Sequence, residues 1–358
     1  MIAGTAAALL AAVLFLPAEA QAVSAQKAYV LDAVSGRVLY EKNPNERSLI
    51  ASTTKIMTAL IVCEQCNVLD RMRIPKEAVG IEGSSMYLKE GEILTLQELL
   101  YGLMLSSGND AAVALAIYCG GTVEGFAELM NDKAHILGMK DTHFENPNGL
   151  DSPGHYSTAK DLAILAAYAM ENPIFAKTVS AKNVKIGERY LTNHNKLLWR
   201  VEGADGVKTG FTKAAGRILV SSATRNGRRL IAVTIDDPDD WGDHAALLEE
   251  GFGRYQIQRI VTEGDKIGSV EVVGGESQRA EVLAAENFDY ALAQEERPQL
   301  ALPGPGFVYA PAVEGADAGY AYVLIEGKAV GKVRVVYGET VEQTKEEEKS
   351  FWQKLFGR

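Results

Sequence analysis

Apolar and polar positions divide the chain into stretches that predict different elements. Residues 27–42 contain two apolar runs around Ser35-Gly36, and residues 216–236 contain two more around Asn226-Gly227. Apolar runs on either side of small turn residues predict β-hairpins, and Asn-Gly is a strong signal for the turn itself. Both ends of this part of the chain therefore predict antiparallel strands.

The pattern between residues 50 and about 200 is mainly helical. Residues 56–63 are apolar on every side, which indicates a helix buried all round rather than an amphipathic one. Residues 96–118 and 158–170 predict further helices, and residues 241–255 predict a helix that covers the sheet. The simplest assembly is one antiparallel sheet made from both ends of the segment. The helical stretch is then inserted as a second lobe, with a cleft between lobe and sheet.

The pattern changes after about residue 257. Short alternating strands separated by glycines follow, in KIGSVEVVGG, AYVLIEGKAV and GKVRVVYGE. Residues 257–340 therefore predict a small all-β domain, a β-sandwich. No cluster of residues in it suggests chemistry.

The two ends of the chain differ from its body. The apolar run 6–16 is too short to span a bilayer and fits a secretory signal, so residues 1–22 predict a signal peptide. A buried N-terminal helix is the alternative. Residues 341–358 place aromatic side chains on one helix face with cations around them, which predicts an amphipathic helix that associates with a membrane surface. A short helix docked on the β domain and a frayed terminus are the alternatives.

Composition narrows the classes of function. With 36 Lys and Arg against 47 Asp and Glu, the net charge is −11, which argues against nucleic acid as a partner bound through charge. Three cysteines exclude a disulfide-dense scaffold and a four-cysteine zinc site, and the histidines lack metal-ligand spacing, so no metal or cofactor is expected. Packing remains open for these cysteines, as does a disulfide from Cys63 or Cys66 to Cys119.

Ser52-Thr53-Thr54-Lys55 places a hydroxyl and an amine three residues apart. On a helix such side chains are neighbours. A serine hydroxyl is a weak nucleophile until a base removes its proton. Lys55 can be that base only if burial or a second ammonium group lowers its pKa.

The order of motifs along the chain strengthens this candidate. Ser-x-x-Lys also occurs at Ser24 and Ser157, so alone it is a weak signal. Ser107-Gly108-Asn109 is the only Ser-x-Asn triplet, and Lys208-Thr209-Gly210 is the only Lys-Thr-Gly triplet. Ser52 precedes both triplets and opens a strongly apolar helix, which neither of the other matches does.

These three motifs, in this order, resemble the triad of penicillin-recognising serine enzymes. The flanking sequences resemble the low-molecular-mass penicillin-binding proteins that are serine-type D-alanyl-D-alanine carboxypeptidases. They are SGRVLYEKN, STTKIMTAL, GSSMYLKEGE, LSSGNDAAVALA, FENPNGLD, HYSTAKDLA, NKLLW, DGVKTGFT and AGRILVSSATRNGRRLIAV. The resemblance implies an α/β fold over residues 27–256: a penicillin-binding transpeptidase-like domain, an antiparallel sheet with helices and an inserted helical lobe. The small all-β domain follows it.

The resemblance also implies catalytic roles. Ser52 would attack the carbonyl between two D-alanines and form an acyl-enzyme, and Lys55 would take its proton. Ser107 would relay a proton to the departing D-alanine. The backbone N–H groups of Ser52 and Phe211 would stabilise the oxyanion.

Substrate binding is implied for the other motif residues. Asn109 would hold the peptide amide, and Thr209 would bind the substrate carboxylate. Lys208 would tune the electrostatics near Lys55. Gly210 would let substrate lie against the strand, because it has no side chain.

The sequence departs from its relatives near the substrate carboxylate. They often have an arginine before N-x-L-L-W, where this chain has His194, and one past the last hairpin, where it has Asp243 and His244. Carboxylate recognition is therefore expected from Thr209, Lys208 and His194. A purely structural role for His194 is the alternative.

The implied substrate is a peptidoglycan pentapeptide stem ending in D-Ala-D-Ala, and β-lactam antibiotics are the implied covalent inhibitors. The expected location is extracytoplasmic, with anchoring to the outer face of the cytoplasmic membrane through the C-terminal helix. Two other functions stay open on sequence alone: a β-lactamase with the same triad, and a cell-wall binding or β-lactam-sensing protein that acylates with little turnover.

Overall fold

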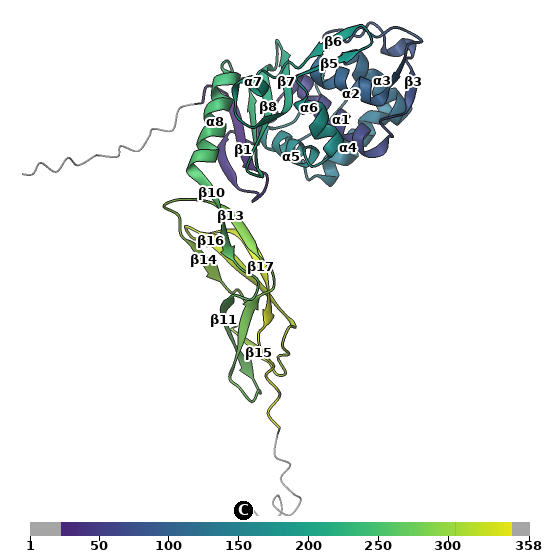
Figure 1. The fold of residues 1–358 in the computed structure, drawn as a ribbon. Helices are drawn as coiled ribbons and strands as arrows, with labels where there is room; N and C mark the ends of the chain where they lie inside the picture. The colour runs from purple at the N-terminus through teal and green to yellow at the C-terminus, as the bar shows by residue number, and fades with distance from the viewer. Residues whose placement is uncertain (1–22, 305, 346–358) are drawn as a thin grey trace, which may run out of the picture.

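The structure is a computed structural model that describes residues 23–304 and 306–345 (Figure 1). The expected signal peptide, residues 1–22, lies outside the described residues, as do residues 346–358 of the expected tail.

A five-stranded antiparallel sheet forms the centre of the first domain, in the order β2-β1-β9-β8-β7. Its strands are β1 (Lys27–Asp32), β2 (Val38–Lys42), β7 (Ala204–Thr212), β8 (Gly216–Arg225) and β9 (Arg228–Ile235). Tyr29 of β1 lies opposite Val233 of β9, so the two ends of the segment meet in one sheet. Both predicted hairpins and the sheet that joins them are confirmed.

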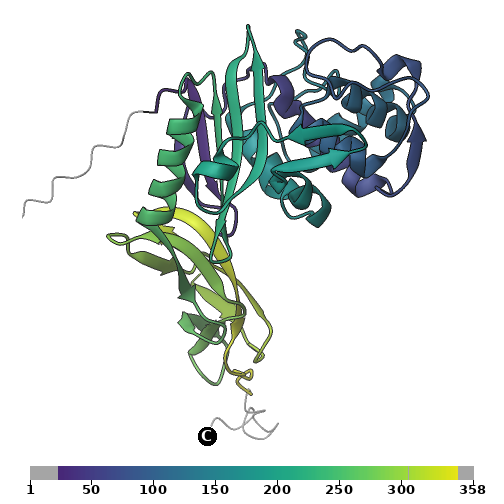
Figure 2. The same ribbon diagram turned by 45° about the horizontal axis from the view of Figure 1, so that its top comes forward.

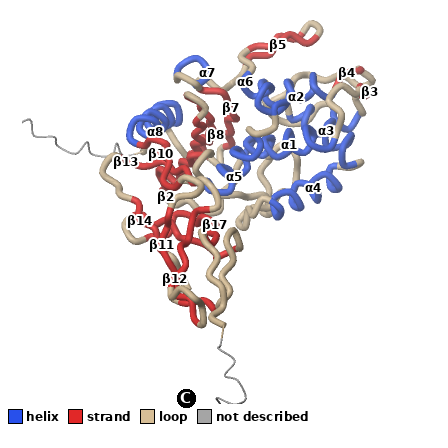
Figure 3. The backbone as a smooth tube through the Cα atoms, turned by 60° about the horizontal axis from the view of Figure 1, so that its bottom comes forward, coloured by secondary structure: helices blue, strands red, loops and turns tan. Residues whose placement is uncertain are grey.

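The segments between the two ends form a helical lobe beside the sheet (Figures 1 and 3). Its helices are α1 (Lys55–Gln65), α2 (Leu96–Leu105), α3 (Asn109–Gly120), α4 (Val123–Ile136), α5 (Ala159–Ala169) and α6 (Pro173–Ser180). The short elements are η1 (Ala51–Thr54), η2 (Lys76–Ala78), β3 (Arg71–Arg73), β4 (Ile93–Thr95), β5 (Asn183–Ile186), β6 (Arg189–Thr192) and α7 (Leu197–Arg200). Every residue from Lys55 to Cys63 is buried, which confirms the helix predicted to be buried on all sides.

The sheet is covered on both faces. Side chains of β9 alternate, so Leu230 and Ala232 pack toward α8 (Asp240–Arg254) while Ile231 and Val233 pack into the core of the helical lobe. Figure 2 shows α8 on the side of the sheet away from the lobe. The predicted helix over residues 241–255 is confirmed as this cover.

The single helix predicted over residues 96–118 is wrong. α2 ends at Leu105 and α3 begins at Asn109. Ser107 between them has a φ of 58°, in the left-handed region that a right-handed helix cannot include. Apolar periodicity continues on both sides of this break, so the pattern alone did not reveal it.

The C-terminal domain is built of strands only. A six-stranded sheet has the order β14-β16-β17-β12-β11-β15, and β10 pairs with β13. The strands are β10 (Tyr255–Val261), β11 (Lys266–Val273), β12 (Arg279–Ala284), β13 (Phe288–Ala293), β14 (Pro298–Ala301), β15 (Phe307–Tyr309), β16 (Asp317–Ile325) and β17 (Lys328–Tyr337). The three strands expected from alternation correspond to β11, β16 and β17, and the all-β character is confirmed.

One arginine ties the two domains together. Arg37 donates from Nη1 to the Ala291 carbonyl at 2.7 Å and makes two bonds of 2.6 Å to the Glu296 carboxylate. Its guanidinium carbon lies 4.6 Å from the centre of the Tyr255 ring and 5.5 Å from that of Tyr290. α8 also leads directly into β10, so the junction is both covalent and electrostatic.

The cysteines adopt one of the arrangements that the sequence left open. Cys66 and Cys119 form a disulfide, with Cα atoms 6.7 Å apart, and join the end of α1 to the end of α3. Cys63 is a free, buried thiol that packs in the lobe.

Within the described residues, no single helix combines the length and the apolar composition that a membrane crossing requires. Only α3 and α4 taken together meet that test, and the pair is bent by 82°.

Candidate active site

Ser52 and Lys55 lie at the junction of η1 and α1. Ser52 belongs to the 3-10 turn that precedes α1, whereas the sequence led us to expect it as the first residue of the helix. Side chains three residues apart eclipse one another in a 3-10 turn. Lys55 Nζ accordingly lies 2.9 Å from Ser52 Oγ.

Lys55 is fully buried and has three oxygen partners. Besides Ser52, its Nζ contacts Asn109 Oδ1 at 2.7 Å and the Asn148 carbonyl at 2.6 Å. Burial lowers the pKa of Lys55 well below its usual value, and the nearby Lys208 ammonium lowers it further, against the opposing effect of Asp110. A neutral amine has two N–H donors and one lone pair. Asn109 and Asn148 offer acceptors for the donors, which leaves the lone pair for the Ser52 hydroxyl.

The Asn148 carbonyl comes from a segment that is bound to α1. His155 Nδ1 accepts from the Glu145 backbone N–H at 3.0 Å, so Nε2 carries the proton and donates to Thr54 Oγ1 at 2.7 Å. Burial lowers the pKa of His155 to about 4, which keeps this ring neutral. Gly149 has a φ of 85°, and a Cβ there would collide with the Ala51 carbonyl oxygen. The sequence analysis gave these residues no role, because the group that reaches Lys55 belongs to the backbone.

The break between α2 and α3 presents Ser107 and Asn109. Asn109 Nδ2 donates to the Glu82 carbonyl at 2.5 Å, and its backbone N–H donates to the Ser84 carbonyl at 2.7 Å. The buried Asp110 carboxylate, in the first turn of α3, fixes the same loop. It accepts from Ser85 Oγ and from the Met86 and Leu88 N–H groups at 2.6, 3.1 and 3.0 Å.

Lys208, Thr209 and Gly210 lie on β7, the edge strand that faces the lobe. Burial lowers the pKa of Lys208 to about 7, and its Nζ donates to the Thr209 carbonyl at 2.9 Å. A Cβ on Gly210 would lie 3.2 Å from the Ile50 carbonyl oxygen. The glycine thus permits a close approach of β7 to the turn that carries Ser52.

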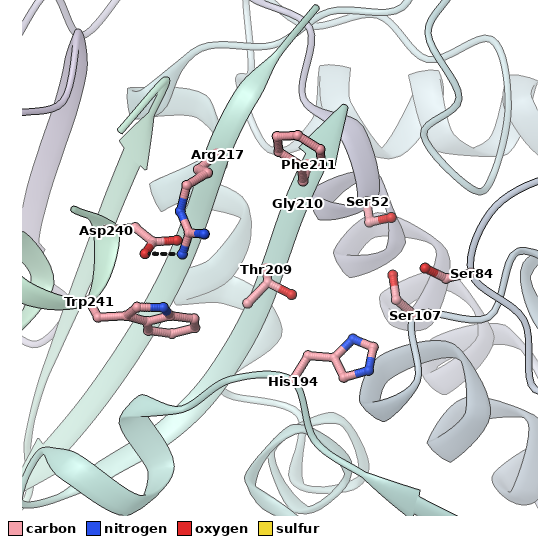
Figure 4. A pocket seen from close by; sticks show the side chains of 10 residues that line it. All are labelled: Ser52, Ser84, Ser107, His194, Thr209, Gly210, Phe211, Arg217, Asp240 and Trp241. Carbon is pink, nitrogen blue, oxygen red and sulfur yellow. Dashed lines mark hydrogen bonds and ion pairs between the residues drawn. The ribbon is translucent and has the colours of Figure 1, made fainter. Parts of the chain in front are cut away.

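The cleft predicted between sheet and lobe is present as a pocket of about 290 Å³ (Figure 4). The motif residues Ser52, Ser107, Thr209 and Gly210 line it. The other lining residues are Ser84, His194, Phe211, Arg217, Asp240 and Trp241. Lys55, Asn109 and Lys208 lie behind this surface as buried side chains.

His194 lies on the wall of the pocket, where Figure 4 shows its ring below Thr209. Its backbone N–H donates to the Leu105 carbonyl at 3.3 Å, at the end of α2. Burial lowers its pKa, and the Lys208 charge lowers it further. A second, shallower groove shares Ser84 and His194 with the pocket and continues past Tyr87 and Tyr190.

The sequence analysis missed four residues of the pocket, namely Ser84, Arg217, Asp240 and Trp241. Arg217 is the cross-strand partner of Phe211, and its Nη2 donates to Asp240 Oδ1 at 2.5 Å. Trp241 follows Asp240 in the first turn of α8. Arg217 is the second residue of β8 and stands before the buried run 218–223, so one polar residue at the start of a strand gave no signal of a site.

Comparison with known proteins gives consistent results over both domains. A family model described as D-alanyl-D-alanine carboxypeptidase matches residues 16–239. A second model, described as the C-terminal domain of penicillin-binding protein 5, matches residues 255–343.

Individual relatives agree. D-alanyl-D-alanine carboxypeptidase DacF of Bacillus subtilis is 35% identical over 275 residues, which are 73% of this chain and 71% of DacF. DacD of Escherichia coli, also named as a D-alanyl-D-alanine carboxypeptidase, is 34% identical over 287 residues, 76% of this chain and 74% of DacD. The crystal structure of penicillin-binding protein 5 from Haemophilus influenzae superposes with a TM-score of 0.77 at 30% identity, covering 90% of this chain and 98% of that one.

The fold, the ordered motifs and the pocket agree with these comparisons. The enzyme is a serine-type carboxypeptidase that acts in peptidoglycan metabolism, and enzymes of this kind act on the cell wall outside the cytoplasm. The resemblance stated from sequence is confirmed, and the carboxypeptidase is favoured over the β-lactamase and the sensor. The chain belongs to the D-alanyl-D-alanine carboxypeptidase family.

Proposed function

We propose that Ser52 is the nucleophile of this carboxypeptidase and that Lys55 is its general base. The observation that carries the proposal is the 2.9 Å contact between Ser52 Oγ and a fully buried amine whose pKa is lowered. The amine takes the hydroxyl proton while the oxygen attacks the carbonyl carbon between the two terminal D-alanines. The peptide C–N bond then breaks, D-alanine leaves with a proton, and the rest of the stem remains as an ester on Ser52.

The oxyanion of the tetrahedral intermediate binds the backbone N–H groups of Ser52 and Phe211 in this proposal. The support is that both residues line the pocket, one on the η1 turn and one directly after Gly210 on β7. Backbone donors of this kind stabilise charge as it develops, without reorganisation during the step.

Ser107 delivers the proton to the departing amine. It lines the pocket, and Figure 4 shows its hydroxyl directed toward the space between Ser52 and Ser84. Asn109 orients Lys55 through Oδ1 and holds the loop through one Nδ2 hydrogen. The second Nδ2 hydrogen remains for a carbonyl of the substrate.

Lys208 acts through charge. It is buried behind Thr209, and its ammonium lowers the pKa of Lys55. Thr209 offers a hydroxyl to the substrate in the pocket. Water then hydrolyses the ester, which restores the Ser52 hydroxyl and releases the stem with a new carboxylate.

We propose that the substrate is the peptidoglycan pentapeptide stem and that β-lactams acylate the same serine. Penicillin presents a strained amide to Ser52, and the acyl-enzyme that results keeps its ring fragment in the pocket. The family supports penicillin binding.

We also propose anchoring of the exported protein at the outer face of the membrane. In Figure 1 the described chain ends at the tip of the β domain, remote from the catalytic domain. The sequence beyond that point carries Phe351, Trp352, Leu355 and Phe356, with lysine and arginine between and after them. The Cys66–Cys119 disulfide supports an oxidising compartment. Deletion of residues 341–358 should move the protein from the membrane fraction to the soluble fraction, and an unchanged distribution would refute the anchor.

The experiment that tests the function uses two reagents on the mature enzyme, diacetyl-Lys-D-Ala-D-Ala and fluorescent penicillin. We expect D-alanine release and long-lived labelling, both lost in Ser52→Ala. Rapid penicillin hydrolysis without peptide cleavage would instead indicate a β-lactamase. Labelling without release of D-alanine would indicate a sensor.

A further inference from the structure

A carboxypeptidase must recognise the free carboxylate at the end of its substrate. Thr209, Lys208 and His194 were the residues expected to do so. Lys208 is 2% exposed, its ammonium bonds to the Thr209 carbonyl, and its pKa is about 7. The pKa of His194 is lowered as well. Neither residue therefore offers a permanent positive charge to the pocket.

Arg217 does offer one. It lines the same pocket as Ser52 and Thr209, and its side chain is 44% exposed. A guanidinium stays protonated under all physiological conditions and can bind a carboxylate with two parallel hydrogen bonds. Among the described residues, Nη2 bonds to Asp240 and no acceptor is bonded to Nη1 or Nε, so those N–H groups are available to a ligand.

Asp240 and Trp241 hold the guanidinium in place. The Asp240 side chain is 4% exposed, lies in the first turn of α8, where the helix dipole favours a carboxylate, and accepts from Nη2. The Trp241 ring centre lies 6.0 Å from the guanidinium carbon. Figure 4 shows these three side chains together at one end of the pocket, across Thr209 from Ser84 and His194.

The position of Arg217 indicates how a peptide substrate would be oriented in the pocket. The groove past Tyr87 and Tyr190 opens at the end marked by Ser84 and His194, whereas Arg217 lies at the other end. A peptide with its scissile carbonyl at Ser52 fits with the stem toward the groove and the C-terminal D-alanine toward Arg217.

We propose that Arg217 binds the terminal carboxylate of the substrate and that Asp240 is its positioning residue. The proposal rests on Ser52 being the nucleophile of this pocket. Stretch 236–248 contains no arginine. Instead, Asp240 of this stretch accepts a hydrogen bond from Arg217, which belongs to β8. The cation therefore reaches the pocket from β8.

The test compares diacetyl-Lys-D-Ala-D-Ala with its C-terminal amide, which lacks the carboxylate charge. We expect Arg217→Ala to lower kcat/KM for the acid by about 10- to 100-fold and to leave kcat/KM for the amide unchanged. Arg217→Lys should recover part of the preference for the acid, because it restores a charge without the planar fork. Asp240→Ala should reduce the preference, and Asp240→Asn should largely restore it, because its amide oxygen still accepts from Nη2.

Lys196→Ala is the matched control. Lys196 Nζ also lies 6.0 Å from the Trp241 ring, but the residue does not line the pocket, so its loss should leave the preference unchanged. An equal loss on acid and amide in Arg217→Ala, or an unchanged rate on the acid, would overturn the proposal. Full activity of Ser52→Ala on either substrate would overturn the proposed function instead.

Discussion

The catalytic domain and the C-terminal β domain bury different kinds of side chain. Among the described residues, every buried polar or charged side chain lies between Asp32 and His244, and those buried in the β domain are aliphatic or tyrosine. Burial of polar groups costs free energy unless each group finds a partner. In the catalytic domain, the buried polar groups include Lys55, whose amine is the proposed base, and the groups that bond to it. The described part of the β domain has small apolar clusters and no comparable network.

The largest effect is expected from removal of the buried amine of Lys55. Lys55→Met keeps the buried volume and removes the base, so acylation by fluorescent penicillin should fall by about 10³-fold or more. Lys160→Met is the matched control, since Lys160 also stands three residues after a serine, Ser157, and is exposed. A loss below tenfold in Lys55→Met would contradict the role of the buried amine.

The second prediction concerns how much the disulfide stabilises the catalytic domain, which buries many polar groups. The chain between Cys66 and Cys119 spans 53 residues, and closing a loop of that length stabilises a domain by at most about 4 kcal/mol. In urea denaturation, the free energy of unfolding of the double variant Cys66→Ser, Cys119→Ser should be lower by an amount that approaches this value.

Cys63→Ala, in the same helix, is the control, because Cys63 has no disulfide to lose. An equal loss in both variants would show that packing, rather than the cross-link, is responsible.

The pH dependence of acylation tests whether the Lys208 charge lowers the pKa of Lys55. The Lys208 charge lowers the pKa of Lys55, so Lys208→Met should raise that pKa. In the proposed mechanism acylation requires neutral Lys55, so its rate rises with pH through the pKa of that residue. This rise should therefore move to higher pH in the variant.

The measurement is the second-order rate of acylation by fluorescent penicillin across the pH range in which both variants remain folded. A shift to lower pH, or no shift, would contradict the effect of the Lys208 charge on the pKa of Lys55.

The smallest expected effect concerns the junction of the two domains. Glu296→Gln weakens the pair with Arg37, which is about 14% exposed, and should lower the free energy of unfolding by about 1–3 kcal/mol. It should change kcat/KM for D-alanine release by less than about twofold, because no catalytic group contacts this pair. A large activity loss in folded Glu296→Gln would show that the β domain is coupled to the site.

The sequence predicts those features that have a local physical cause. Asn226-Gly227 fixes a hairpin because it favours the required turn, and the uniformly apolar α1 could only be buried. The contact between Ser52 and Lys55 follows from their spacing of three residues.

Other features depend on contacts that sequence periodicity does not encode. The left-handed Ser107 interrupts an apolar pattern that otherwise continues. The Asn148 carbonyl has no side-chain signature, and Arg217 acquires its environment from Asp240 on a different element. In the β domain, short strands such as β14 and β15 show too little alternation to be recognised.

The central claim is that the hydroxyl of Ser52, activated by Lys55, forms the covalent intermediate. The most direct measurement is peptide mapping by mass spectrometry after a brief reaction with penicillin. We expect one penicilloyl adduct per chain, on the peptide that contains Ser52, and none in Ser52→Ala. An adduct on Ser107 or on any other residue of the wild-type enzyme, or one that persists in Ser52→Ala, would contradict it.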